Sequence, residues 1–293
     1  MKIKKLISAL VLGSMLVGLS GCNITDFSAE NLLRPPKAVG DEAEIEQLIA
    51  KTADSGYTLK YPKNGKFRSA IIMTDLDGND SNEAVAFFRN SVETSSVHML
   101  VMYSKDNSWE IASDNIFETT DIDSVDFADL TGNGKAEIIV NSTTYTPNVG
   151  KLSCYSYSEG KTNEVGSGQS CSSFVTGDFD NDGTSEIMSL VLYTTENEAL
   201  ASMLDYNEDS KSLYAKAMAN MDPNVVKYKN IAVTKLDNDI TGIVVDGTSA
   251  NEVTNTQVIF YSRDLAILRN PLFKEKAKNI TRRSSQVICS DID

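Results

Sequence analysis

The chain has 293 residues, of which 41% are apolar and 23% are charged, proportions that are typical of a globular protein with a packed core. Its formal net charge is −14, and the charge becomes −17 without the three lysines in residues 1–21. A nucleic-acid partner requires clustered Lys and Arg, so this acidic balance argues against one and favours a protein that gathers cations.

Residues 1–21 have the features of a lipoprotein signal peptide. A basic start precedes an apolar stretch, residues 6–19, that is shorter than a membrane span. The segment runs into Leu19-Ser-Gly-Cys22, which resembles a bacterial lipobox, and this resemblance implies cleavage before Cys22 and acylation of that cysteine. The sequence therefore predicts a lipidation site at Cys22 and an extracytoplasmic protein anchored to the bacterial cell membrane.

Residues 22–40 are predicted to form a tether, because Pro35 and Pro36 favour an extended polyproline conformation. A short helix is expected at residues 41–54, where Ile45, Leu48 and Ile49 fall on one face. We expect that face to pack on the first sheet, and binding of a partner is the alternative. Residues 41–293 are expected to combine this helix with a series of β-repeats.

An acidic phrase occurs four times between short apolar runs in the rest of the chain. Its fullest form is Asp178-Phe-Asp-Asn-Asp-Gly-Thr-Ser-Glu186, with carboxylates at positions 1, 3, 5 and 9 and Gly at position 6. The other copies begin at Asp75, Asp129 and Lys235, so the intervals are 54, 49 and 57 residues. The flanking runs resemble strands, which excludes an EF-hand because its loop lies between helices. Repeats of this length are typical of a propeller or a stacked array.

The phrase places oxygen atoms at alternate positions around a tight turn, an arrangement that suits Ca²⁺. The candidate ligands are the residues at positions 1, 3, 5 and 9 of the first three copies: Asp75, Asp77, Asn79, Glu83, Asp129, Thr131, Asn133, Glu137, Asp178, Asp180, Asp182 and Glu186. The first copy has Asp80 where the turn glycine is expected, the second has Thr131 in place of an acid, and the fourth lacks the first and ninth ligands. The alternative to a metal is a scaffold of Asx turns, in which Asp and Asn side chains cap their own backbone.

These repeats resemble the FG-GAP or VCBS type found in extracellular β-propellers, and the resemblance covers roughly residues 65–293. It implies an all-β fold, a propeller-like array of four-stranded blades in which each acidic loop joins two strands and often holds a structural Ca²⁺. The chain stops at Asp291-Ile-Asp293, 56 residues after Lys235, as if within a fifth loop. We therefore expect an incomplete array of about four to five blades, truncated at the C-terminus; a natural terminus is the alternative.

Few residues outside the repeats point to chemistry. His98 is the only histidine, which excludes multi-histidine metal sites, and we expect it to be structural. Cys154 and Cys171 either pair across a hairpin or remain separate thiols, because the sequence does not fix their register.

The expected role is binding or scaffolding at the cell surface, without enzymatic activity. The partners are then the membrane, through the lipid, and an unidentified protein or glycan. One alternative is an enzyme that acts on an extracellular polysaccharide or cell-wall polymer; another is an envelope assembly factor. Paired carboxylates occur almost only in the repeat loops, so the sequence singles out no catalytic pair.

Overall fold

The computed structural model describes residues 40–54, 56–146, 148–193, 196 and 198–270, together with the backbone of residues 280–283 and 286–289. The predicted signal peptide, Cys22, the tether up to residue 39 and the terminal Asp291–Asp293 lie outside the described residues. The chain divides into two compact units, Met1–Ala43 and Glu44–Asp293, and the second contains the repeats. In the described part of the chain, no helix has the length and apolar character needed to cross a membrane.

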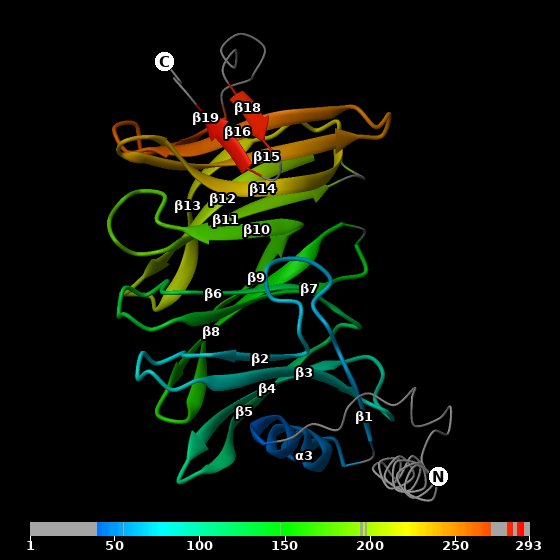
Figure 1. The fold of residues 1–293 in the computed structure, drawn as a ribbon. Coiled ribbons are helices and arrows are strands. Elements are labelled where there is room, and N and C mark those ends of the chain that lie inside the picture. The colour runs from blue at the N-terminus through cyan, green and yellow to red at the C-terminus, as the bar shows by residue number, and fades with distance from the viewer. Residues whose placement is uncertain are drawn as a thin grey trace, which may run out of the picture. The chain divides into compact units, whose positions relative to one another are not determined.

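The second unit is built of antiparallel sheets that follow one another along the chain, as predicted for an all-β fold (Figure 1). Sheet A contains β1 (Tyr57–Leu59), β2 (Ile71–Thr74), β3 (Glu83–Asn90), β4 (Val97–Lys105) and β5 (Ser108–Phe117). Sheet B contains β6 (Ile122–Ala128), β7 (Glu137–Thr143), β8 (Gly150–Ser158) and β9 (Lys161–Cys171). Sheet C contains β10 (Ser173–Gly177), β11 (Glu186–Tyr193), β12 (Glu198–Asn207) and β13 (Ser212–Asn220). Sheet D contains β14 (Val225–Asp237), β15 (Ile240–Ser249), β16 (Thr254–Ser262) and β17 (Ile267–Arg269). A pair formed by β18 (Ile280–Arg283) and β19 (Gln286–Cys289) follows.

Sheet A is four strands wide although it has five strands. Both β1 and β2 pair with β3, through Leu59 opposite Phe88 and Ile71 opposite Ala86, so they share one edge. Each of the four sheets therefore repeats the same four-stranded meander. This confirms the prediction of four-stranded units, and in sheets A, B and C an acidic phrase follows β2, β6 or β10.

Buried side chains hold neighbouring sheets face to face. One apolar cluster joins sheets A and B, a second joins B and C, and a third joins C and D. The first strands β6, β10 and β14 lie beside one another, and so do the last strands β5, β9, β13 and β17. The second strand of a sheet is thus covered on both faces, which explains why Ile138, Ile139 and Val140 are all fully buried although successive side chains point to opposite faces.

Helix α3 (Asp41–Ala53) covers the outer face of sheet A. Its buried residues Ile45, Ile49 and Ala53 belong to one cluster with Phe88 and Leu100 of the sheet. The helix ends one residue before the predicted boundary, and its apolar face packs as predicted.

The two described cysteine side chains are separate buried thiols, so the disulfide alternative is wrong. Cys154 lies opposite Gly166, whereas Cys171 lies opposite Gly150. Gly150 and Cys154 are four positions apart, which corresponds to about 13 Å along the strand and is well beyond the span of a disulfide. Burial raises the pKa of the Cys171 thiol to about 12, which keeps it unreactive near neutral pH.

Candidate metal sites

The first three acidic phrases form equivalent connections between the first long strand of a sheet and the strand that follows it. We call them loop A (residues 75–83), loop B (residues 129–137) and loop C (residues 178–186). In each loop, the glutamate at position 9 lies opposite the residue that precedes position 1: Glu83 opposite Thr74, Glu137 opposite Ala128 and Glu186 opposite Gly177. The loops therefore share one length and one register, so equal positions can be compared directly.

The aspartate at position 1 caps the backbone of its own loop. In loop C, the amides of Asp182 and Gly183 donate to Asp178 Oδ1 and Oδ2, each at 3.1 Å. Asp75 and Asp129 accept the equivalent bonds in loops A and B. The side chain at position 5 adds an Asx turn in every loop, as in Thr184 N–H to Asp182 Oδ1 at 2.8 Å.

Two positions of every loop adopt left-handed backbone conformations, not one as the phrase suggested. At position 4, φ is +74° for Gly78, +71° for Gly132 and +61° for Asn181. At position 6, φ is +79° for Gly134 and +94° for Gly183, and Asp80 takes the same conformation at +65°. Asp and Asn tolerate this region better than most residues with a Cβ, so the missing glycine of loop A leaves the turn intact.

The glutamate at position 9 is an anchor inside the protein. Its Oε2 accepts the amide of position 2 at 2.8 Å in all three loops, from Leu76, Leu130 and Phe179. The apolar side chains at position 2 are at most 2% exposed and join the clusters between the sheets. Position 2 was missed in the sequence analysis, although its consistently large apolar side chain was a usable signal.

The residue at position 3 decides whether the second glutamate oxygen has a partner. In loop B, the Thr131 hydroxyl donates to Glu137 Oε1 at 3.2 Å. In loop C, position 3 is Asp180, and Glu186 Oε1 is buried without a hydrogen-bond partner among the described residues. In loop A, the buried oxygen that finds no partner within the described part of the chain is Oδ1 of Asp77, the position 3 residue itself.

Loops A and C bring the predicted carboxylates together. One oxygen each from Asp178, Asp180, Asp182 and Glu186 lie within 4.8 Å of one another, and so do oxygens of Asp75, Asp77 and Glu83. Loop B offers only two carboxylates, Asp129 and Glu137, because Thr131 and Asn133 are neutral. Asn79 and Asn133 use their side-chain oxygens in Asx turns.

The crowded carboxylates of loop C oppose ionisation of Glu186. Burial and the neighbouring charges of Asp180, Asp182 and Asp205 raise the pKa of Glu186 to about 8, although the Phe179 amide acts in the opposite direction. Burial likewise raises the pKa values of Glu83 and Glu137. A bound cation would reverse this effect, because it favours the charged form of each ligand.

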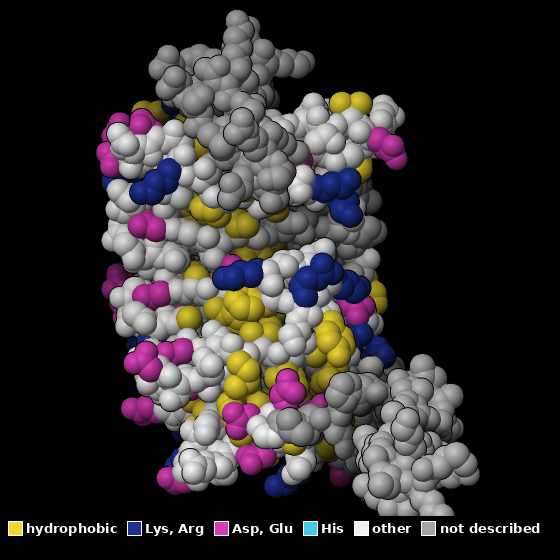
Figure 2. Space-filling model, in the orientation of Figure 1, with side chains coloured by type: hydrophobic (Ala, Val, Ile, Leu, Met, Phe, Trp, Pro, Cys, Tyr) yellow, Lys and Arg dark blue, Asp and Glu magenta, His cyan; other side chains and the backbone are white. Residues whose placement is uncertain are grey.

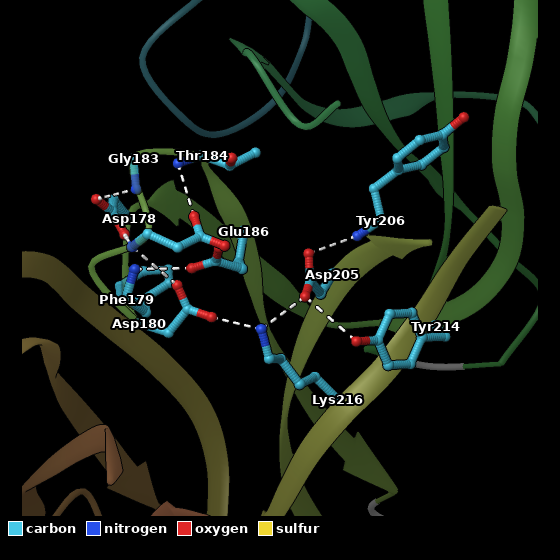
Figure 3. A network of polar contacts seen from close by, with 11 residues as sticks. Asp178, Phe179, Asp180, Gly183, Thr184, Glu186, Asp205, Tyr206, Tyr214 and Lys216 are labelled. Carbon is cyan, nitrogen blue, oxygen red and sulfur yellow. Dashed lines mark hydrogen bonds and ion pairs between the residues drawn. The ribbon is translucent and has the colours of Figure 1, made fainter. Parts of the chain in front are cut away.

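Lys216 links loop C to strands β12 and β13 of the same sheet (Figure 3). Its ammonium group lies between Asp180 Oδ2 and Asp205 Oδ2, at 2.8 Å from the latter. Lys216 is the extra residue of a β-bulge, since Met203 lies opposite Ala217 while Leu204 lies opposite Ala215. Burial lowers the pKa of Lys216, but its bonds to the two carboxylates outweigh this effect and raise it overall.

The three loops are also bonded to one another. The amide of Ala136 in loop B donates to the carbonyl of Leu76 in loop A at 3.1 Å, and Ser185 in loop C donates to the carbonyl of Asp129 at 2.9 Å. The loops therefore form a column along one edge of the sheets. Figure 2 shows acidic side chains along that edge, on the left, and Lys and Arg side chains nearer the middle of the face.

The fourth copy has lost the loop. Asp237 lies opposite Ile240, so only Asn238 and Asp239 connect β14 to β15. The Asp237 side chain accepts the Asn238 amide at 2.7 Å. The turn is too short for the nine-position arrangement, in agreement with the missing ligands at positions 1 and 9.

His98 occupies a structural position in sheet A. Its ring is buried, stacks on Phe88 with centroids 4.8 Å apart, and places Nδ1 at 2.9 Å from Asp114 Oδ1. These contacts fix the ring between strands β3, β4 and β5, as expected for a side chain that supports the sheet.

Comparison with protein-family models gave no match, and neither did comparison with curated protein sequences. The class that the fold and loops define is an all-β protein of stacked, four-stranded antiparallel sheets with a column of acidic loops at one edge.

Proposed function

We propose that this chain is a cell-surface binding or scaffolding protein whose sheets are blades of a propeller-type array, braced by Ca²⁺ in loops A and C. The observation that carries the proposal is the unpartnered Glu186 Oε1, buried among three aspartates whose oxygens lie within 4.8 Å. Leaving a buried carboxyl oxygen without a partner is costly, and a cation with several oxygen ligands removes that cost.

The position of the loops gives such an ion a structural role. Each loop joins two strands of one sheet and is hydrogen-bonded to the loop of a neighbouring sheet. An ion in loop C would hold β10 and β11 together and would reinforce the contact with loop B. The proposed role of the ion is therefore to stabilise the fold. Ligand binding is assigned to other surfaces of the sheets.

A calcium titration of the purified chain tests this proposal. Millimolar Ca²⁺ is expected to raise the melting temperature relative to the chelated protein, and Mg²⁺ at the same concentration is expected to raise it less. The matched variant Asp180→Thr gives loop C the position 3 residue of loop B and should reduce the Ca²⁺-dependent shift. Equal melting temperatures with Ca²⁺ and with chelator would refute the metal sites.

The proposed location at the outer face of a bacterial membrane is supported by the basic start, the apolar stretch and the lipobox-like residues that end at Cys22. Expression of the whole chain in bacteria fed labelled palmitate tests it. Label is expected in the wild type and not in Cys22→Ser, and equal labelling of the two would exclude lipidation at Cys22.

A further inference from the structure

A groove of about 890 Å³ opens beside the first strands of sheets B, C and D, away from the acidic loops. The segment after β1 contributes Lys63 and Asn64, and β14 contributes residues 226–231. The wall between them mixes apolar side chains such as Phe174 and Leu192 with hydroxyl and amide side chains, among them Ser124, Asn141, Thr143, Ser172 and Ser173. The groove thus offers many hydrogen-bonding groups to a ligand long enough to cross several sheets.

The charge of the groove is opposite to that of the whole chain. Among the described residues that line it, Lys63, Lys227 and Lys229 outnumber the single carboxylate, Asp123, in a chain with a net charge of −14. The Asp123 carboxylate already accepts bonds from Asn64 at 2.9 Å and from Asn141 at 3.3 Å. These bonds occupy the carboxylate oxygens but leave the negative charge, so the lining carries two more positive than negative groups.

Lys227 and Lys229 are the free cations of the groove. They are two residues apart on β14, so their side chains project from the same face of the strand, and both are exposed. Of the ion pairs formed within the described ranges, none involves either residue; Lys63, in contrast, pairs with Asp121 at 3.0 Å.

Two irregularities of the sheets converge on the groove. In β6, Asp123 is the extra residue between the pairs Ile122–Ser142 and Ser124–Asn141. In β14, Asn230 and Ile231 lie opposite the single residue Val245, and Asn230 has φ of +49°. Bulges redirect side chains and are over-represented beside binding and active sites.

We infer that this groove binds an acidic oligosaccharide, a chain of hydroxyl-rich units that carries carboxylate or phosphate groups. The amides and hydroxyls of the wall match sugar hydroxyl groups, and Lys227 and Lys229 provide the charges for the acidic groups. This inference rests on the proposed binding role and gives it a ligand class.

Calorimetry with a hyaluronan hexasaccharide as the acidic probe and chitohexaose as the neutral probe tests the inference, in about 1 mM Ca²⁺. The wild-type chain should bind the acidic oligosaccharide and not the neutral one. The double variant Lys227→Gln, Lys229→Gln should weaken that binding by about tenfold or more, because each lost ion pair lowers the affinity several-fold. Lys105→Gln with Lys161→Gln, which removes two exposed lysines outside the groove, should bind like wild type.

Any of four results overturns the inference: no binding of the hexasaccharide, equal binding of both probes, no effect of the groove variant, or an equal loss in the control. Measuring the Ca²⁺-dependent melting shift on the same samples separates this inference from the proposed function. A retained shift without oligosaccharide binding rejects the groove alone, whereas lysine-dependent binding without a shift rejects the metal sites alone.

Discussion

Thr131 and Glu137 form a closed pair in loop B, where the threonine hydroxyl donates to Glu137 Oε1 at 3.2 Å. The equivalent pair in loop C, Asp180 and Glu186, leaves the corresponding oxygen without a partner in the described structure. The two loops share one backbone conformation. The residue at position 3 determines whether the second oxygen of the position 9 glutamate has a hydrogen-bond partner. We expect this difference to separate a loop that folds on its own hydrogen bonds from one that requires a cation.

The substitution Thr131→Asp tests that separation in loop B. It removes the hydroxyl donor and adds a carboxylate, so the chelated variant should be destabilised by about 1–3 kcal/mol, the usual cost of an unsatisfied buried polar group. With Ca²⁺ in large excess, binding should restore up to about 3 kcal/mol at 100 times the dissociation constant. Chemical denaturation with and without chelator measures both values, and a variant as stable as wild type in chelator would contradict the expectation.

The pH dependence of stability provides an independent test in loop C. The folded-state pKa of Glu186 is raised to about 8 from an ordinary value of 4.5. Its favourable contribution is therefore complete below pH 4.5 and is lost as the pH rises through about 8. In chelator, wild type should lose stability as the pH rises from 4.5 to about 8. Glu186→Gln should lose less over the same pH range, since the glutamine side chain never ionises.

Calcium should invert that trend, because the metal binds the carboxylate and competes with its proton. The Ca²⁺-dependent stabilisation should therefore grow as the pH rises through about 8. Denaturation curves at several pH values measure it. Glu118→Gln, which replaces an exposed carboxylate, should keep the wild-type behaviour; the same behaviour in Glu186→Gln would show that Glu186 is not the group responsible.

Much of this architecture could be predicted from local sequence. The spacing of the acidic phrases and the apolar runs beside them predicted the repeated meander, and positions 1, 3, 5 and 9 predicted which oxygens gather in loop C. Lys216 could not be found in this way, because a bulge between β12 and β13 brings it to Asp180, which lies 36 residues earlier. The groove likewise depends on bulges at Asp123 and Asn230, whose strand registers are set by packing between sheets.

The apolar side chain at position 2 should determine how firmly each loop is attached. Phe179 is 2% exposed and packs among Met188, Leu190 and other residues between sheets C and D. Phe179→Ala should cost about 3–5 kcal/mol through the cavity it leaves. Phe179→Leu should cost less than half as much, because Leu76 and Leu130 occupy the same position in the other loops. Equal losses of stability in the two variants would show that packing of the position 2 side chain is not the cause.

Lys216 should oppose calcium while it supports the metal-free fold. Its ammonium group forms ion pairs with both Asp180 and Asp205, and its side chain is 23% exposed. Lys216→Met should therefore destabilise the chelated protein by about 1–3 kcal/mol, less than the loss of a partner in a fully buried ion pair. The same change leaves loop C more negative, so Ca²⁺ should bind more tightly and the difference between the calcium and chelator melting temperatures should widen. Lys161→Met, at an exposed position in β9, is the matched control and should leave that difference unchanged. If the difference narrows in Lys216→Met, the lysine assists the bound ion, and its role as a competing cation is wrong.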